Sequence, residues 1–285
     1  MPFLLFVLGA SVGSFLNVVS LRYNPDKFLF GRSLLGRSRC PHCGRTLHWF
    51  ELVPVLSFIL QLGRCRHCRA ALSLEYPITE ILSGLIFVFI PTRLKSPYFI
   101  LNLYSMFSVI SALWILVFVA LLLVALIDIR LSIIPDELNI ALLVLGIILI
   151  FTSQPGFGLA GGSFLESFAP LFGFRENIWV NHVLGALVAG LFFLGLIFIT
   201  RGRGIGMGDL KLAVPLGLIF GWPDTIFIVG VAFVIGSLFG AYIMLFQGKT
   251  LKSYLPLGPF LVGSAAIIFF FGQQLMRFYL GLFGL

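Results

Sequence analysis

Asp209 lies at the end of a glycine-rich turn between two strongly apolar runs. Residues 201–211 contain four glycines, two arginines and this one carboxylate, and the next apolar run starts at Leu212. Glycines such as Gly206 and Gly208 would let another backbone approach closely. A second acid, Asp128, ends an earlier apolar run that carries no other charge. Acidic residues within membrane segments are costly, so this pair is a candidate functional site.

Two carboxylates held close together cannot both ionise easily, and they therefore share one proton. The ionised carboxylate can take a proton from water while the protonated one polarises a peptide carbonyl. This is the chemistry of an aspartyl protease, which forms no covalent intermediate. The chain contains no H-E-x-x-H motif. We therefore predict Asp128 and Asp209 as the catalytic pair, with Gly206, Gly208 and Lys211 supporting the turn.

Each acid also has a structural interpretation. Asp128 could be a helix-end residue that pairs with Arg130, and Asp209 could be the N-cap of a helix over 210–221. Asp136 and Glu137 follow a proline, which is typical of an ordinary helix start. We interpret these two as structural.

The only four cysteines of the chain form two pairs, C-x2-C and C-x2-C, separated by twenty-one residues. Cys40, Cys43, Cys65 and Cys68 present four thiolates, which suits tetrahedral Zn²⁺ in a closed structural site. Disulfides and an iron–sulfur centre are the alternatives, and a cytoplasmic location argues against disulfides. The surrounding segment, 23–75, has too few apolar residues for its own core, so the metal would supply folding energy.

The composition indicates a polytopic helical membrane protein. Of the 285 residues, 59% are hydrophobic and 11% are charged, and the mean hydropathy is +1.08. Soluble domains carry about 25% charged residues. The apolar runs are continuous and do not alternate, which excludes a β-barrel. Eight of them could span a membrane: about 3–21, 77–91, 103–127, 138–152, 183–200, 210–221, 225–246 and 256–272. A Gly/Ser/Pro-rich loop is predicted over 153–178.

The distribution of basic residues predicts the orientation. If segment 23–75 is cytoplasmic, fifteen of the nineteen Lys and Arg residues are cytoplasmic. Asp128 and Asp209 then both lie at cytoplasmic helix ends. The same rule explains the net charge of +8, and without a basic stripe with interleaved aromatics we predict no nucleic-acid partner. The first run lacks a basic n-region, so we predict a retained helix rather than a cleaved signal peptide.

The predicted fold is all-α, with about eight transmembrane helices and a small cytosolic zinc-binding loop domain. Its parts are a first transmembrane helix (1–22), the zinc loop domain (23–75), a second helix with its outer loop (76–102) and a six-helix membrane core (103–285).

Six motifs in order resemble the prepilin peptidases, the type IV leader peptidases of the GxGD class of membrane aspartyl proteases. They are the N-terminal signature at 9–22, the two cysteine pairs, the YPxxE motif at 75–80, the ID…PD motif at 127–136, the GxGxGDxK motif at 204–211 and a PxGPF motif at 255–260. Two positions depart from the family pattern, where Glu75 replaces a basic residue and Leu257 replaces a phenylalanine.

The resemblance implies that Asp128 and Asp209 cleave the leader peptides of type IV prepilin or pseudopilin precursors in the bacterial inner membrane, at its cytoplasmic face. It also implies N-methylation of the new N-terminus with S-adenosylmethionine. The chain has no glycine-rich cofactor fingerprint, so the methyl-donor site stays unplaced, with Glu80 as one candidate. Two other functions remain open: a proton-coupled transporter that uses the acids as a relay, and a zinc-loop membrane scaffold in which the acids only cap helices.

Overall fold

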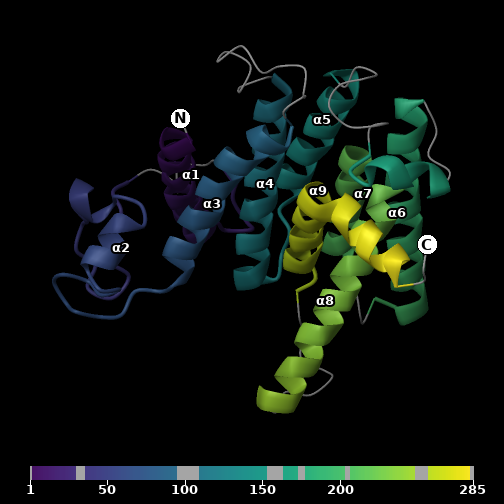
Figure 1. Cartoon of the computed structure of the whole chain (residues 1–285). Helices are drawn as coiled ribbons and strands as arrows, with labels where there is room; N and C mark the ends of the chain where they lie inside the picture. Colours follow the sequence, from purple (N-terminus) through teal and green to yellow (C-terminus); the bar gives the residue numbers. More distant parts are fainter. Residues whose placement is uncertain are drawn as a thin grey trace, which may run out of the picture. The chain divides into compact units, whose positions relative to one another are not determined.

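The computed structural model describes residues 2–29, 36–94, 109–152, 163–172, 177–202, 206–247 and 256–282. Within these residues the fold is all-helical, as predicted, and two isolated β-bridges are the only extended pairings (Figure 1). The elements are α1 (Pro2–Arg22), η2 (Trp49–Glu51), α2 (Leu56–Leu60), α3 (Glu75–Arg93), α4 (Val109–Leu131), α5 (Asp136–Thr152), η5 (Glu166–Phe172), α6 (Ile178–Thr200), α7 (Met207–Phe220), α8 (Asp224–Gln247) and α9 (Gly258–Gly281).

Five of these helices are long and apolar enough to cross a membrane: α1, α4, α6, α8 and α9. Large apolar side chains cover their outward faces, and Phe198 of α6 and Leu245 of α8 are 87% and 79% exposed. Such faces suit contact with lipid rather than water. α5 and α7 have 17 and 14 residues, fewer than the roughly 20 that a full span needs.

Each of the eight predicted apolar runs contains a long helix, but several ends differ from the prediction. α7 begins at Met207 rather than 210, and α9 continues to Gly281 rather than 272. Residues 103–108 of the third run lie outside the described residues, and α4 continues past Asp128 to Leu131. Ser132 then adopts a left-handed conformation with φ of 54°, which ends the helix.

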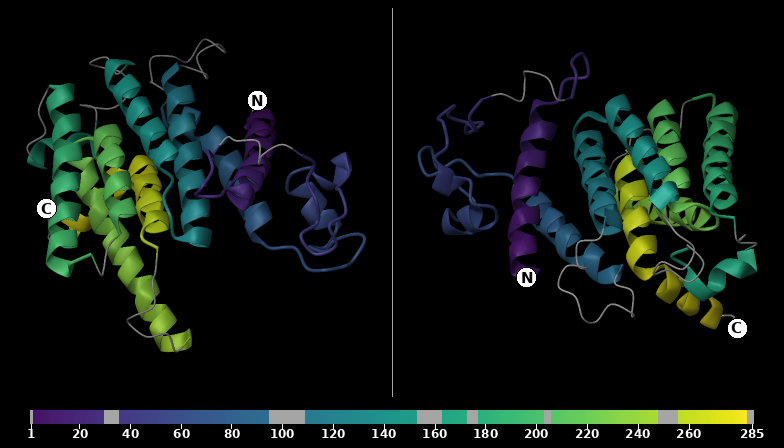
Figure 2. Two further views of the ribbon diagram at one scale, coloured as in Figure 1. Left: turned by 180° about the vertical axis from the view of Figure 1, so that it is seen from behind. Right: turned by 90° about the horizontal axis from the view of Figure 1, so that it is seen from above.

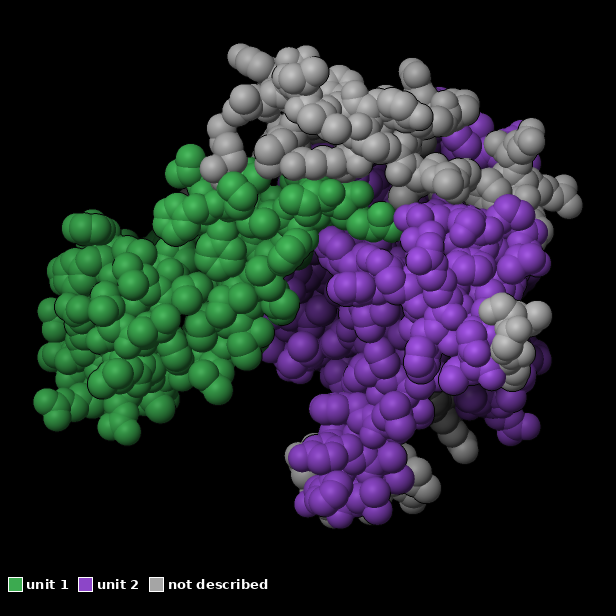
Figure 3. All heavy atoms as spheres, in the orientation of Figure 1, with its two compact units in different colours: residues 1–93 green, residues 94–285 purple. Residues whose placement is uncertain are grey.

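The chain forms two compact units, residues 1–93 and 94–285 (Figure 3). In the first unit, α1 packs closely against α3. A Cβ atom added at Gly13 would lie 2.8 Å from the Cα atom of Glu80, and one added at Gly9 would lie 2.7 Å from the carbonyl oxygen of Ser83. The small residues at 9–14 therefore allow the close helix approach that the sequence predicts.

The second unit is held together by an aromatic cluster of Trp114, Phe118, Phe164, Phe220 and Phe269. The ring centroids of Trp114 and Phe269 are 4.8 Å apart, and those of Phe164 and Phe269 are 4.6 Å apart. These side chains come from α4, α7, α9 and the segment before η5. Because all five side chains are at most 6% exposed, the cluster fixes the three helices relative to one another.

The cluster lies toward the start of α4, the end of α7 and the middle of α9. The other ends of these helices carry Asp128, Asp209 and Gly258. From the cluster to those three residues, each helix rises by roughly 16–21 Å at 1.5 Å per residue. The packing of the aromatic cluster therefore also determines how the opposite ends of the three helices, which carry Asp128, Asp209 and Gly258, lie relative to one another.

Asp224 illustrates a buried acid with a purely structural environment. It is fully buried, and its carboxylate accepts hydrogen bonds from the Ser163 hydroxyl (2.6 Å) and the Phe164 N–H (2.9 Å). These hydrogen bonds connect the segment before η5 to the first turn of α8.

The predicted loop over 153–178 contains a short 3-10 helix, η5. The C-terminal half of α8 instead projects from the rest of its unit (Figure 2).

Candidate functional site

Asp128 occupies the last turn of α4 and is 3% exposed. Its Oδ2 accepts a hydrogen bond of 3.1 Å from the backbone N–H of Gly258, the first residue of α9. A Cβ atom at position 258 would collide with this same oxygen. Glycine is therefore required there because the backbone itself must reach the carboxylate.

Asp209 is the third residue of α7 and is 6% exposed. Its Oδ2 accepts a hydrogen bond of 3.2 Å from the N–H of Gly206, the N-cap residue. The helix therefore starts earlier than the sequence indicates, and the N-cap interpretation of Asp209 is wrong by three positions. Its carboxylate still lies at the positive end of the α7 dipole, which favours a negative charge.

The structure brings the two predicted acids together in one unit. Asp128 and Asp209 are eighty-one positions apart in the chain, and both are buried near helix ends of the second unit. The N-terminus of α9 supplies one backbone donor to Asp128, and the N-terminus of α7 supplies one to Asp209. Two buried carboxylates that lie close together disfavour double ionisation. The sharing of one proton by these two acids stays a prediction.

Lys211 connects two of the sequence motifs. Its Nζ lies 2.7 Å and 3.0 Å from the two carboxylate oxygens of Asp136, the first residue of α5. Both side chains are about half exposed, so the ion pair adds little free energy of folding. It does fix the first turn of α7 against the first turn of α5, which fits the supporting role predicted for Lys211.

The glycines beside Asp209 are not demanded by the fold. Gly206 has φ of −81° and ψ of 157°, which any residue adopts. A Cβ atom at Gly208 would lie 3.5 Å from Ile134, an ordinary van der Waals distance. Positions 203–205, which include the first glycine of the motif, lie outside the described residues. The predicted role of Gly206 and Gly208 in admitting another chain stays a prediction.

Sequence reasoning missed Gly258 as a site residue, although the PxGPF motif contains it. The competing interpretation, in which Asp128 pairs with Arg130, stays open. One described partner of the Asp128 carboxylate is the backbone N–H of Gly258 at the start of α9. A glycine–proline pair was the available signal, because proline at the first turn indicates a helix start, and the first N–H groups of a helix have no partner within the helix and can bond to a side chain.

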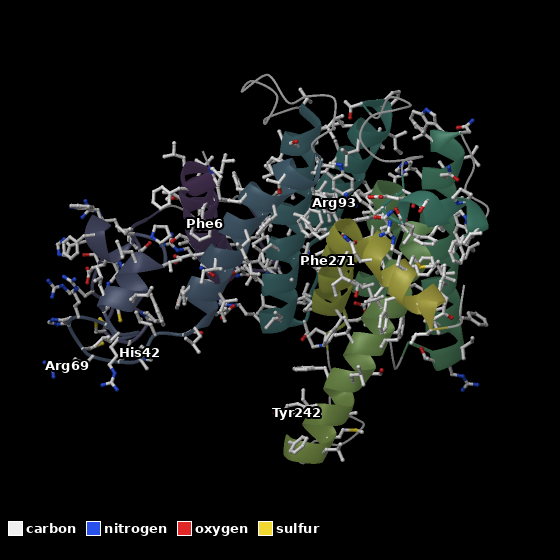
Figure 4. The ribbon with its side chains drawn as sticks, viewed as in Figure 1. Phe6, His42, Arg69, Arg93, Tyr242 and Phe271 are labelled. Carbon is white, nitrogen blue, oxygen red and sulfur yellow. The ribbon has the colours of Figure 1, made fainter. Side chains whose placement is uncertain are left out.

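The four cysteines cluster in the first unit. Their Sγ atoms all lie within 4.8 Å of one another, and none forms a disulfide. The Sγ atoms of Cys40 and Cys68 are 3.9 Å apart, near the roughly 3.8 Å expected between thiolates that lie about 2.3 Å from a tetrahedral zinc. The donor set and its spacing therefore fit a zinc ion. Figure 4 shows sulfur atoms beside His42 and Arg69 in this region.

The two cysteine pairs fold into equivalent knuckles. In each, the N–H of the first cysteine bonds to a carbonyl five residues later, Arg45 or Ala70. The residue after the second cysteine is left-handed in both: Gly44 with φ of 71° and Arg69 with φ of 55°. The N–H groups of Cys68 and His67 lower the pKa of the Cys65 thiol to about 7, whereas burial and the neighbouring cysteines raise the pKa of Cys68 to about 11, so the metal-free cluster favours one thiolate and not four.

Two family models match the chain. The bacterial peptidase A24 N-terminal domain matches residues 7–94, and the type IV leader peptidase family matches residues 114–241. The first match covers α1, the cysteine pairs and α3, and the second covers both acids. No solved structure matches the chain.

Several relatives align over nearly the whole chain, and each is named prepilin leader peptidase/N-methyltransferase. The protein of Burkholderia pseudomallei strain 1026b is 34% identical over 98% of this chain and 87% of its own length. The proteins of Bacillus subtilis and Aeromonas salmonicida strain A449 are 29% and 27% identical, over 97% of this chain and 97% and 93% of their lengths. With two domain models in order and such coverage, the chain belongs to the type IV leader peptidase family.

Proposed function

We propose that the protein is a membrane aspartyl endopeptidase that cleaves the leader peptides of type IV prepilin-like precursors and then N-methylates the new N-terminus. The observation that supports the peptidase half is that Asp128 and Asp209 are both buried in the second unit and that each accepts a hydrogen bond from one backbone N–H at the start of a helix. The family membership and the names of the relatives support the same activities.

Both anchoring bonds end on Oδ2 atoms, and in the proposal the Oδ1 atoms face the catalytic water. In the proposed mechanism one carboxylate takes a proton from this water as it attacks the peptide carbonyl. The other carboxylic acid donates a hydrogen bond to the carbonyl oxygen and stabilises its developing negative charge. The proton then passes to the leaving amine, and the pair returns to its singly protonated state.

The membrane arrangement that we propose has eight spans, with the shorter α3, α5 and α7 completing the five longer helices. The distribution of Lys and Arg residues supports a location of the cysteine loop, which is segment 23–75, at the cytoplasmic face of the bacterial inner membrane, together with Asp128 and Asp209. A precursor with a basic leader and an apolar segment would then present its scissile bond at the depth of the two acids. The cysteine loop would be a small zinc domain with Cys40, Cys43, Cys65 and Cys68 as ligands.

Mass spectrometry of a precursor co-expressed with the protein tests the whole proposal. We expect a product that has lost its leader and has gained 14 Da on its new N-terminal residue, since a methyl group replaces one hydrogen. A precursor expressed alone is the control. An unprocessed precursor would contradict the peptidase, and a cleaved product without added mass would contradict the methyltransferase.

Gly258→Ala is expected to reduce cleavage by about 100-fold, because the added methyl group collides with the Asp128 carboxylate and misplaced catalytic groups lose activity on this scale. The measurement is the rate of leader removal by purified protein. Gly263→Ala is the matched control, since a Cβ atom at this position of α9 meets nothing within 4 Å. Equal rates in both variants would contradict the assigned role of Gly258.

A further inference from the structure

The cysteine loop presents large apolar side chains on its outside. Trp49 of η2 is 79% exposed, Ile59 and Leu60 of α2 are 60% and 66% exposed, and Leu62, which follows α2, is 86% exposed. Because η2 and α2 contact each other, these four residues come from neighbouring parts of the loop. We call them the apolar surface of the loop. Single exposed apolar residues are normal, whereas a group of them marks an interaction site.

Leu62 is held exposed by a defined turn with an unfavourable backbone. Its φ is 52°, and its N–H bonds to the carbonyl oxygen of Ile59 at 2.9 Å. Val55, at the other end of α2, has φ of 62°. Positive φ is uncommon for residues other than glycine, above all for a β-branched one. Strain of this kind is often found at functional sites.

Two hydrogen bonds place the start of α2 beside the membrane helices of its unit rather than beyond their ends. The N–H of Val55 donates to Glu80 Oε2 at 2.7 Å, and the Ser14 hydroxyl bonds to the same carboxylate. Ser14 precedes the end of α1 at Arg22 by eight residues, and Glu80 follows the start of α3 by five. At 1.5 Å per residue, Val55 therefore lies roughly 8–12 Å inside these helix ends.

This depth is that of an interfacial helix, whose apolar face is buried roughly 5–10 Å into the boundary between headgroups and acyl chains. Within the first unit, Figure 1 shows α2 level with α3. Figure 4 shows His42 and Arg69 of the two knuckles at the lower end of the unit, away from Phe6 of α1. The apolar part of the loop therefore lies beside the membrane helices, and its charged part lies toward their cytoplasmic ends.

Arginines border the apolar surface. Segment 36–74 contains six arginines and a single acidic residue, and Arg64 and Arg66 follow α2 closely and are exposed. The Arg66 guanidinium carbon lies 5.1 Å from the ring centroid of Phe50, which is 5.9 Å from that of Trp49. The cytoplasmic leaflet is negatively charged and attracts such side chains. The charge of the loop therefore complements anionic lipid.

We propose that the apolar surface of the loop docks into the cytoplasmic leaflet, with Trp49, Leu60 and Leu62 among the upper acyl chains and Arg64 and Arg66 at anionic lipid phosphates. The inference rests on the proposed membrane arrangement, in which the loop is cytoplasmic. It gives the loop an attachment to the membrane besides α1 and α3, and this attachment keeps the knuckles at the membrane surface.

Fluorescence quenching of the full-length protein in vesicles tests the docking. The vesicles contain phosphatidylglycerol and a phosphatidylcholine that is brominated near the top of its acyl chains. The contribution of Trp49 is the difference in emission between the unmodified protein and Trp49→Phe. We expect bromination to lower this contribution by about half or more, because Trp49 lies at the depth of the bromine atoms. Omission of phosphatidylglycerol should weaken the quenching, since the arginines then lose their anionic partners.

The double variant Leu60→Glu, Leu62→Glu should restore the emission of Trp49, because carboxylates in the apolar surface oppose insertion. Thr46→Glu is the matched control, since it adds a carboxylate at an exposed position of the first knuckle, outside the apolar surface, and it should leave the quenching unchanged. A metal content equal to that of the unmodified protein shows that each variant keeps its loop folded.

Equal Trp49 emission in brominated and unbrominated vesicles would overturn the inference. If the emission then changed only when a precursor was added, the apolar surface would belong to the substrate and not to lipid. Quenching needs neither cleavage nor methylation. A protein that docks and processes no precursor would therefore contradict the proposed function while this inference stands.

Discussion

Asp128→Asn and Asp209→Asn are each expected to lower precursor cleavage by roughly 10³-fold or more while the protein still accumulates. An amide can neither take a proton from water nor share one with its neighbour, and such proton transfers contribute about 10²–10⁴-fold to rates. Asparagine keeps an oxygen that can accept the N–H of Gly258 or Gly206. The local fold is therefore retained, and the loss belongs to the chemistry.

The double variant is expected to be no less active than either single variant, because the two acids act as one unit. Glu137→Gln makes the same carboxylate-to-amide change in the first turn of α5 and should leave cleavage within about twofold. Leader removal by purified protein is the measurement. Retained cleavage in the double variant would exclude the aspartyl mechanism, and it would favour the scaffold interpretation, in which these acids only cap helices.

The sequence predicted the helical fold well, because long apolar runs have few alternatives in a membrane. Helix ends were harder to predict. The run over 210–221 excluded Met207 and Gly208, since glycine-rich stretches usually indicate turns. In the structure, Asp209 and the N–H of Gly206 stabilise a helix start inside that stretch. The start of α7 therefore depends on this hydrogen bond and on the helix dipole, and local composition does not reveal either of them.

The pairing of Asp128 with Asp209 was predicted from the scarcity of acids and their common membrane face. The contact of Asp128 with Gly258 was not predicted, because it depends on how α4 and α9 pack. The cavity of about 540 Å³ beside Glu80 was also not predicted. It is lined by α1, by α3 and by residues between 36 and 72, and the packing of these segments leaves no periodic signal in the sequence.

Metal removal is expected to unfold the cysteine loop selectively. Segment 36–74 contains no long helix, and each of its two knuckles is closed by a single β-bridge, so four thiolates around the proposed zinc ion would be its main cross-link. Structural zinc contributes about 10–16 kcal/mol in small peptides. We expect one zinc per chain by elemental analysis, and a chelator should expose the loop to protease while leaving residues 109–282 resistant.

Cys43→Ser and Cys68→Ser should each reduce the zinc content to below about a tenth of an ion per chain, since three thiolates no longer close the tetrahedral shell. His42→Ala is the control, because His42 lies between paired cysteines, is exposed and is no member of the sulfur cluster. Iron in place of zinc, or full zinc content in both serine variants, would contradict the four-thiolate site. Because all four cysteines lie in the first unit, the chelated protein should keep the two acids of its second unit in place.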